Sequence, residues 1–313
     1  MSKIQDHEIN IIDKRFWFFL LSAIIIVPGI LSLGFFGLKS GIDFQSGSSL
    51  TLHFSPSIEE NQLRQSLTTL GYSDASVQHT GQEDFLVRLR QISSDERQQL
   101  TDKLGVALNC TVTVRDFAVV SPIVASQTAR YAAIAVLVAA VGILLYITWA
   151  FRRMPKPMRW GTCAVIALLH DVFLVLGVFS ILGRLAGVEV DALFITAMLT
   201  VAGYSVHDTI VVFDRIRENL TKGINAEFAE VVNYSVVQTL VRSLNTSITV
   251  LIVLFALLLL GGATIHYFVL ALLIGVITGT YSSIFNASAL LVVWENREWR
   301  KFIPFISRKE VTT

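Results

Sequence analysis

Six long apolar stretches constrain the fold of this 313-residue chain more than any other feature. A helix needs about 20 predominantly apolar residues to cross the hydrocarbon core of a bilayer. Six ranges meet this criterion: 16–38, 128–150, 160–182, 191–213, 239–260 and 265–294. The composition agrees, because 53% of the residues are hydrophobic and 16% are charged, against about 25% charged in soluble domains. The sequence therefore predicts an α-helical polytopic protein with six transmembrane helices embedded in a lipid bilayer.

Basic residues predict how these helices are oriented. If six helices alternate in direction, four segments lie on one side: 1–15, the short loop 151–159, the loop 214–238 and the tail 295–313. They carry Lys3, Lys14, Arg15, Arg152, Arg153, Lys156, Arg159, Arg215, Arg217, Lys222, Arg297, Arg300, Lys301, Arg308 and Lys309. The short loops on the other side contain a single basic residue, Arg184. Cytoplasmic loops carry the excess of Lys and Arg, so we expect a multi-pass protein of the cell (inner) membrane with both termini cytoplasmic.

The polar region 39–127, between the first two apolar ranges, is expected to form a small domain outside the cytoplasm. Alternating apolar residues predict strands at 48–54, 75–80, 84–90 and 110–117, with the second and third joined across Gly81–Gln82. Helical spacing and capping residues predict helices near 58–71 and 93–105. The order β-α-β-β-α-β is typical of a ferredoxin-like α+β domain. Residues 41–121 contain ten acidic and six basic side chains, so the domain is acidic where the opposite side is basic.

Several classes of function are disfavoured by the sequence. A net charge of +1 argues against a nucleic-acid-binding protein. Two cysteines without metal-ligand spacing predict no metal site, and no phosphate-binding loop or nucleophile elbow suggests an enzyme or a bound cofactor. His170 and Asp171 are adjacent, and since neighbours on a helix are expected to point apart, they are not predicted to act as a pair.

The candidate functional residues are ionisable side chains within apolar ranges, namely Asp208, Arg242 and Asp171. Charges at such depth cost several kcal/mol unless they are paired or hydrated, and they commonly mark ion pathways. Polar residues lie one helical turn from two of them, with His207 as an alternative proton carrier. These supporting candidates are Tyr204, Ser205, His207, Asn245 and Thr246. The polar stripe around Asp208 and the polar stripe around Arg242 are expected to face each other across the bundle interior.

A static alternative stays open for these residues. Arg242 can extend toward the lipid headgroups while Asp208 pairs with it and clamps two helices without carrying protons. Asp43, which lies between Gly41 and Gly47, is expected to form a turn into the first strand rather than an ion site.

Five segments resemble the SecF subunits of the SecD/SecF family, within the resistance-nodulation-division superfamily. They read GIDFQSGSSL, LLHDVFLVLG, GYSVHDTIVVFDRIREN, QTLVRSLNTSITV and GTYSSIFNASAL, and they occur in the family's order across nearly the whole chain. The resemblance implies a subunit that uses the proton-motive force, together with a SecD-like partner and beside the Sec channel, to assist late translocation of a polypeptide. It implies a proton gradient rather than a cofactor.

The same resemblance implies roles for two residues. Asp208 matches the family's proton-pathway carboxylate and Arg242 its essential arginine. The chain departs from the family pattern at His207, where the family usually has Asn, and at Val120–Ser121–Pro122, where it usually has Val-Gly-Pro. Two other functions remain open: one half of a proton-driven exporter of small molecules or lipids, and a purely structural subunit of the translocon.

Overall fold

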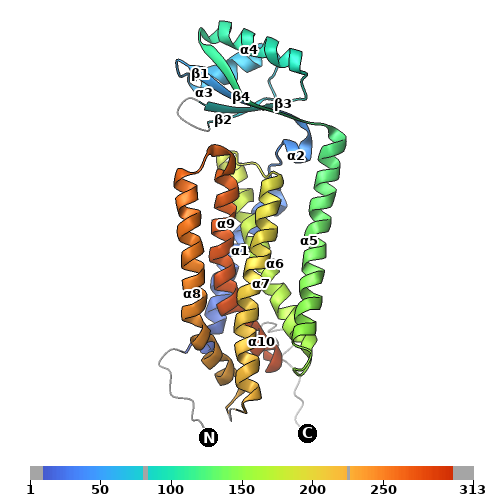
Figure 1. Cartoon of the computed structure of the whole chain (residues 1–313), viewed down its shortest axis with the longest axis vertical. Helices are drawn as coiled ribbons and strands as arrows, with labels where there is room; N and C mark the ends of the chain where they lie inside the picture. Colours follow the sequence, from blue (N-terminus) through green and yellow to red (C-terminus); the bar gives the residue numbers. More distant parts are fainter. Residues whose placement is uncertain (1–9, 80–83, 224–225, 299–313) are drawn as a thin grey trace.

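Six long helices form a bundle with a small α+β domain at one end (Figure 1). The computed structural model describes residues 10–79, 84–223 and 226–298. The helices are α1 (Arg15–Phe36), α5 (Pro122–Ala150), α6 (Pro157–Ala186), α7 (Ala192–Thr221), α8 (Phe228–Leu260) and α9 (Ala263–Tyr281). α9 continues through a π-helical turn, here called the π segment (Ser282–Ala287), into α10 (Ser288–Glu295). All six are long and apolar enough to cross a membrane, which confirms the predicted fold class.

Helices extend beyond the apolar ranges, so the expected loop 214–238 is largely helical. α7 continues to Thr221 and α8 begins at Phe228. α5 begins at Pro122, within the range expected to be external, because the Ser121 side chain caps it and proline suits a first helical turn. The hydropathy of a sequence detects only the part of a helix that lies in the hydrocarbon core of the bilayer. Lys3, Arg300, Lys301, Arg308, Lys309 and the Gly81–Gln82 connection lie outside the described residues.

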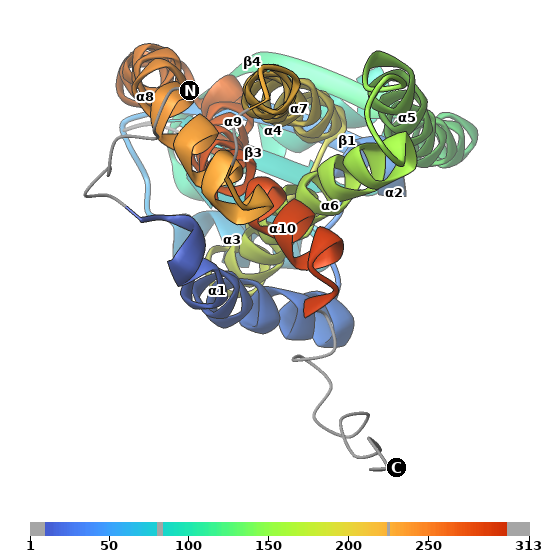
Figure 2. The same cartoon turned by 90° about the horizontal axis from the view of Figure 1, so that it is seen from below.

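Three of the membrane helices form the centre of the bundle. In the most apolar 18-residue stretch of α6, of α7 and of the last membrane helix (Thr264–Glu295, which joins α9, the π segment and α10), 44–56% of the residues are buried. In α1, α5 and α8 the share is 6–17%. Figure 2 shows this division from the end opposite the domain, with α1, α5 and α8 at the periphery. Exposed apolar side chains such as Ile24, Leu137 and Ile252 cover the outer helices. Such a surface suits hydrocarbon rather than water.

α1 crosses α6 at two glycines whose backbones touch. A Cβ atom added to Gly177 would lie 2.6 Å from the Gly29 Cα, and one added to Gly29 would lie 2.9 Å from the Gly177 Cα. Small residues allow this close approach between membrane helices, where van der Waals packing drives association. The crossing fixes α1 against the middle of α6, next to the Ser32–Ser180 hydrogen bond of 2.9 Å.

The small domain has the predicted β-α-β-β-α-β order. Its elements are β1 (Gly47–Ser55), α3 (Glu60–Thr69), β2 (Ser76–His79), β3 (Asp84–Leu89), α4 (Ser94–Leu108) and β4 (Thr111–Val120). The four strands form an antiparallel sheet in the order β2-β3-β1-β4. Alternation along β1 buries Leu50, Leu52 and Phe54 in one core with Leu63 of α3 and Leu104 of α4.

The domain is tied to the α6–α7 loop of the bundle. Ser40, just before the short helix α2 (Ile42–Gln45), forms a parallel β-bridge with Val190. The carboxylate of Glu189, only 5% exposed, forms ion pairs with Arg88 of β3 and with Lys39 at 3.3 Å. The Asp43 carboxylate accepts a hydrogen bond of 2.9 Å from the backbone N–H of Ala192. Asp43 therefore caps α7, the helix that carries Asp208.

Replacing Gly177 with alanine is expected to destabilise the bundle by about 1–3 kcal/mol, because the added methyl group meets α1 backbone. The matched control is Gly34→Ala in α1, where nothing lies within 4 Å of the added Cβ. Unfolding of both variants in mixed micelles measures the difference. Equal stability of the two variants would show that the glycine contact is not tight.

Removing the Arg88 side chain is expected to weaken the attachment of the small domain to the α6–α7 loop by about 1–3 kcal/mol, because Glu189 remains buried with one ion-pair partner fewer. Hydrogen exchange of the loop 187–191 should rise in Arg88→Ala. Arg115→Ala is the control, since its ion pair with Asp84 has an arginine side chain that is 55% exposed and contributes about 0–1 kcal/mol. Unchanged exchange in Arg88→Ala would mean that Glu189 does not hold the domain.

Candidate functional site

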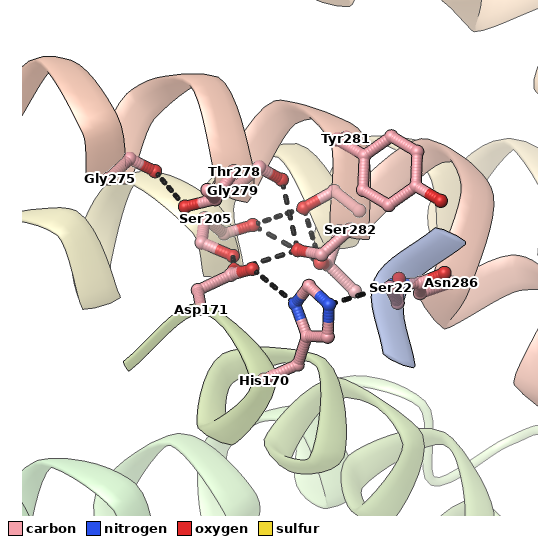
Figure 3. Close-up of polar contacts among 12 residues, drawn as sticks. Ser22, His170, Asp171, Ser205, Gly275, Thr278, Gly279, Tyr281, Ser282 and Asn286 are labelled. Atoms are coloured by element: carbon pink, nitrogen blue, oxygen red, sulfur yellow. Dashed lines mark hydrogen bonds and ion pairs between the residues drawn. The ribbon is translucent and has the colours of Figure 1, made fainter. Parts of the chain in front are cut away.

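A fully buried carboxylate, Asp171, lies at the junction of three central helices. Its Oδ2 atom accepts hydrogen bonds from Ser205 of α7 at 2.6 Å and from Ser282 of the π segment at 2.7 Å. Its Oδ1 atom lies 3.0 Å from Nδ1 of His170 (Figure 3). The expectation that His170 and Asp171 point apart is therefore wrong. Their side chains turn toward each other because both reach into the same polar junction.

His170 extends this polar contact to the first membrane helix. Its Nε2 atom lies 3.4 Å from Nδ2 of Asn286 in the π segment. The same Nδ2 atom donates a hydrogen bond of 2.8 Å to the Ser22 hydroxyl of α1. A chain of polar contacts thus runs across the bundle from α1 through α6 to α7. Since lipid offers no hydrogen-bonding groups, these polar contacts are all made within the protein.

The π segment supplies the polar side chains of this junction. Ser282 and Asn286 contact α6 and α1, while the hydroxyl of Ser283 donates to the Ser205 carbonyl at 2.8 Å and lies 2.9 Å from the Thr209 hydroxyl. A π turn inserts one extra residue per turn and is frequent at functional sites. Here it brings three side chains of one short segment to three different helices.

Two glycines of α9 let this segment approach α7. A Cβ atom at Gly275 would lie 2.2 Å from the Val201 side chain, and one at Gly279 would lie 2.9 Å from the Ser205 Cβ. This close contact explains how Ser205 and Ser282, on different helices, reach the same carboxylate oxygen.

Asp208 of α7 is buried, and one of its carboxylate oxygens lacks a hydrogen-bond partner among the described residues. It is 3% exposed, and its Oδ2 atom has no hydrogen-bond partner within the described residues. Across the same residues it forms no ion pair with Arg242, which is exposed on α8. Burying a carboxylate oxygen without a hydrogen-bond partner costs free energy. Asp208 is thus the opposite of Asp171, whose two oxygens accept hydrogen bonds.

The polar stripe of α8 does not face α7. Arg242, Asn245 and Thr246 are exposed on the outer side of α8, so the expectation that the two stripes meet across the interior is wrong. α8 instead packs on α7 through Ser247, which accepts a hydrogen bond of 2.9 Å from the Tyr204 hydroxyl. His207 is also exposed.

Sequence patterns do not identify the polar side chains of the π segment that line the junction around Asp171. Ser282, Ser283 and Asn286 are small polar residues in the range 265–294, which hydropathy predicts as one continuous apolar helix. The signal that could have found them is their density, since SSIFNAS places four hydroxyl or amide side chains within seven residues. Among the residues that the structure describes, no group of three or more metal-ligating side chains lies together.

Comparisons with known proteins match most of this chain to one family. Residues 101–297 match the family model described as protein export membrane protein SecD/SecF, C-terminal, and residues 31–58 match the SecD/SecF GG motif. The chain is 47% identical to the protein translocase subunit SecF of Thermobaculum terrenum, over 93% of this chain and 95% of that protein. It is 43% identical to the SecF subunit of Anaerolinea thermophila, over 94% and 96%.

A solved structure has the same fold. The crystal structure of SecDF from Thermus thermophilus, a translocon-associated membrane protein, superposes with a TM-score of 0.83 at 35% identity. The match covers 95% of this chain and 40% of that longer chain. Family model, relatives and fold together show that this multi-pass membrane protein belongs to the SecD/SecF family of protein-export membrane proteins.

Proposed function

We propose that the chain is an accessory subunit of the Sec protein translocase that uses the proton-motive force to assist late polypeptide translocation, with Asp208 as its proton-binding carboxylate. The observation that carries the proton step is the buried, unpaired Oδ2 atom of Asp208. Binding or release of a proton there changes the charge at a buried oxygen that no hydrogen bond compensates within the described residues. Such a change shifts which helix packing is favoured.

Membrane potential supplies enough energy for this step. One elementary charge crossing 100 mV corresponds to about 2.3 kcal/mol, which is sufficient to bias a bundle between two packings. The proposed carriers are protons alone, with no cofactor. Arg242 is proposed as the second residue of the proton pathway; it is exposed on α8 and forms no ion pair with Asp208 within the described residues.

A route from Asp208 to the small domain follows α7. The helix begins at Ala192, whose N–H binds Asp43 of the segment leading into β1. The preceding loop holds the domain through Glu189. A shift of α7 along or about its axis would therefore move the domain, which we propose contacts the translocating polypeptide.

The exposed stripe on α8 supports a SecD-like partner within the membrane. Arg242 and Asn245 project outward where lipid would surround them, and a charged side chain in hydrocarbon costs several kcal/mol. The solved SecDF chain is longer than this one, which covers 40% of it. We propose that a SecD-like subunit covers the stripe and that the Sec channel lies beside the complex.

Charge supports the orientation with both termini cytoplasmic in the cell membrane. Arg152, Arg153 and Lys156 lie between α5 and α6, at the bundle end opposite the domain. The Arg15–Glu298 ion pair, 2.6 Å long, joins the two described ends of the chain. The small domain would then lie outside the cytoplasm, where an emerging polypeptide is found.

Asp208→Asn is expected to abolish proton-driven export, because an amide cannot release a proton, while the protein stays folded and bound to its partner. Asp214→Asn is the matched control: it lies six residues further along α7, and its carboxylate is exposed and paired with Arg217. Export into vesicles with an imposed proton gradient measures both. Normal gradient-driven export by Asp208→Asn would favour the purely structural role.

A photo-crosslinking amino acid in place of Asn245 is expected to label the SecD-like subunit in membranes. The matched control is the same amino acid in place of Trp17, which is 72% exposed on α1 and should label lipid. Equal labelling of the SecD-like subunit from both positions, or none from position 245, would contradict the proposed partner surface.

A further inference from the structure

We propose that a cleft beneath the small domain binds a positively charged segment of an extended polypeptide. The cleft lies between the open face of the β-sheet and the end of the bundle that carries the α6–α7 loop. The proposal deepens the proposed function and rests on it in one respect, namely that the polypeptide would be the one in translocation. The cleft itself is built from contacts that do not involve Asp208.

One face of the sheet carries side chains that neither α3 nor α4 covers. In β1, Leu50 and Leu52 are buried against these helices, so Ser49 and Thr51 point to the opposite face. Figure 1 shows α4 on the side of the sheet away from the bundle, and the open face is therefore turned toward the bundle. An antiparallel sheet can leave one face solvated, so the side chains of this face are available to a ligand.

A cleft of about 500 Å³ separates the open face from the bundle. Side chains of all four strands line it on one side, and Thr264 and Tyr267 of α9 line it on the other. This volume is within the range of about 300–1,000 Å³ that is typical of ligand sites. Four neighbouring strands span about 14 Å, which is the length of about four residues of extended chain. The cleft therefore suits a short extended segment.

The lining of the cleft has an excess of three negative charges. Five carboxylates and two guanidinium groups line it. Both arginines are already paired, Arg88 with Glu189 and Arg115 with Asp84 at 3.1 Å. The carboxylates of the lining that have no ion-pair partner among the described residues are those of Asp43, Asp116 and Asp191. Walls of low dielectric strengthen the field of such charges inside a cleft, so this cleft attracts cations.

Hydrogen bonds orient two of these carboxylates without neutralising them. Asp43 accepts from the N–H of Ala192 at 2.9 Å, and Asp191 accepts from the N–H of Phe194 at 2.8 Å. A carboxylate has about four lone-pair sites, so each can also accept from an ammonium or guanidinium group. Asp116 lines the cleft from β4. A segment with two or three basic side chains would therefore meet carboxylates on both walls.

The ion pair between Arg88 and Glu189 closes one side of the cleft. Both residues also line a second hollow of about 450 Å³, so they stand between the two spaces. The charged residues that line only the second hollow are Lys39, Arg90 and Asp74. The two spaces therefore differ in the sign of their charge, and we expect a cationic segment in the first space only.

Contacts between the domain and the α6–α7 loop hold the cleft open. The Gln78 side chain donates a hydrogen bond of 2.7 Å to the Gly187 carbonyl, and the Ser76 hydroxyl donates one of 3.2 Å to Glu189. A preformed site loses little conformational freedom when it binds a ligand. α7 begins at this cleft, beside Asp43 and Asp191, so the proposed shift of α7 would change the spacing of the walls and the affinity for the polypeptide.

Site-specific labelling tests the proposal on the full chain with its SecD-like partner in lipid vesicles, without a proton gradient. The probe is a soluble, unfolded peptide with a block of lysines, added on the side of the small domain. A photo-crosslinking amino acid in place of Ala118, which is exposed and lines the cleft, should label this peptide. The control position is Val106 of α4, which is 86% exposed and lies on the helix-covered side of the sheet.

We expect about threefold more labelling from position 118 than from position 106, because opposite charges concentrate the peptide in the cleft. The difference should disappear in about 1 M salt, where charges more than about 3 Å apart are screened. Equal labelling from the two positions at low salt would overturn the proposal. So would labelling from position 118 that reaches lipid or the SecD-like subunit but not the peptide.

Charge reversal separates recognition of charge from general stickiness. Asp116→Lys should reduce labelling of the lysine peptide by about three- to tenfold and increase labelling of a peptide with glutamates in place of the lysines. Asp102→Lys is the matched control, since it changes the net charge equally at an exposed position of α4. Equal effects of the two substitutions would overturn the proposal.

None of these readouts depends on export or on Asp208. Export that continues in Asp208→Asn while labelling behaves as expected would refute the proposed proton step and leave the cleft supported. Loss of export in Asp208→Asn without specific labelling from position 118 would refute the cleft alone.

Discussion

Three hydrogen bonds to one buried carboxylate organise the centre of this protein. Asp171 binds Ser205 of α7, Ser282 of the π segment and His170 of its own helix. Lipid cannot replace any of these partners, so the register between α6, α7 and the last helix depends on keeping them together. The glycines of α9 and the crossing of α1 at Gly29 bring the remaining helices close enough for this junction to form.

The bundle contains two carboxylates in contrasting surroundings. Asp171 has hydrogen bonds to both oxygens, whereas Asp208, one helical turn beyond Ser205, has a buried oxygen with no such partner in the part of the chain that the structure describes. The hydrogen-bonded carboxylate of Asp171 holds the helices together. The buried oxygen of Asp208 lacks the hydrogen bond that would offset its desolvation. α7 connects both to the small domain, because its first N–H binds Asp43 and the loop before it carries Glu189.

Local signals in the sequence predicted the helices and the small domain, but not the junction. Apolar length identified six membrane helices, and alternation such as Leu50, Leu52 and Phe54 identified strands. Asp171 was identified by its charge, yet its partners Ser205 and Ser282 lie 34 and 111 residues away along the chain. The π segment contains no proline or glycine that would signal a break, so it results from packing. Spacing placed Arg242 and Asn245 on one side of α8 but could not say which way that side points.

Protonation of Asp208 is proposed to move the small domain relative to the bundle. Spin labels at the exposed positions Ala107 of α4 and Met158 of α6, after replacement of Cys110 and Cys163, report this distance across the molecule. The measurement is the distance distribution at neutral and acidic pH in the reconstituted complex with its SecD-like partner. We expect two distributions that differ with pH in the unaltered chain and a single pH-independent distribution in Asp208→Asn. The same distribution at both pH values in the unaltered chain would contradict it.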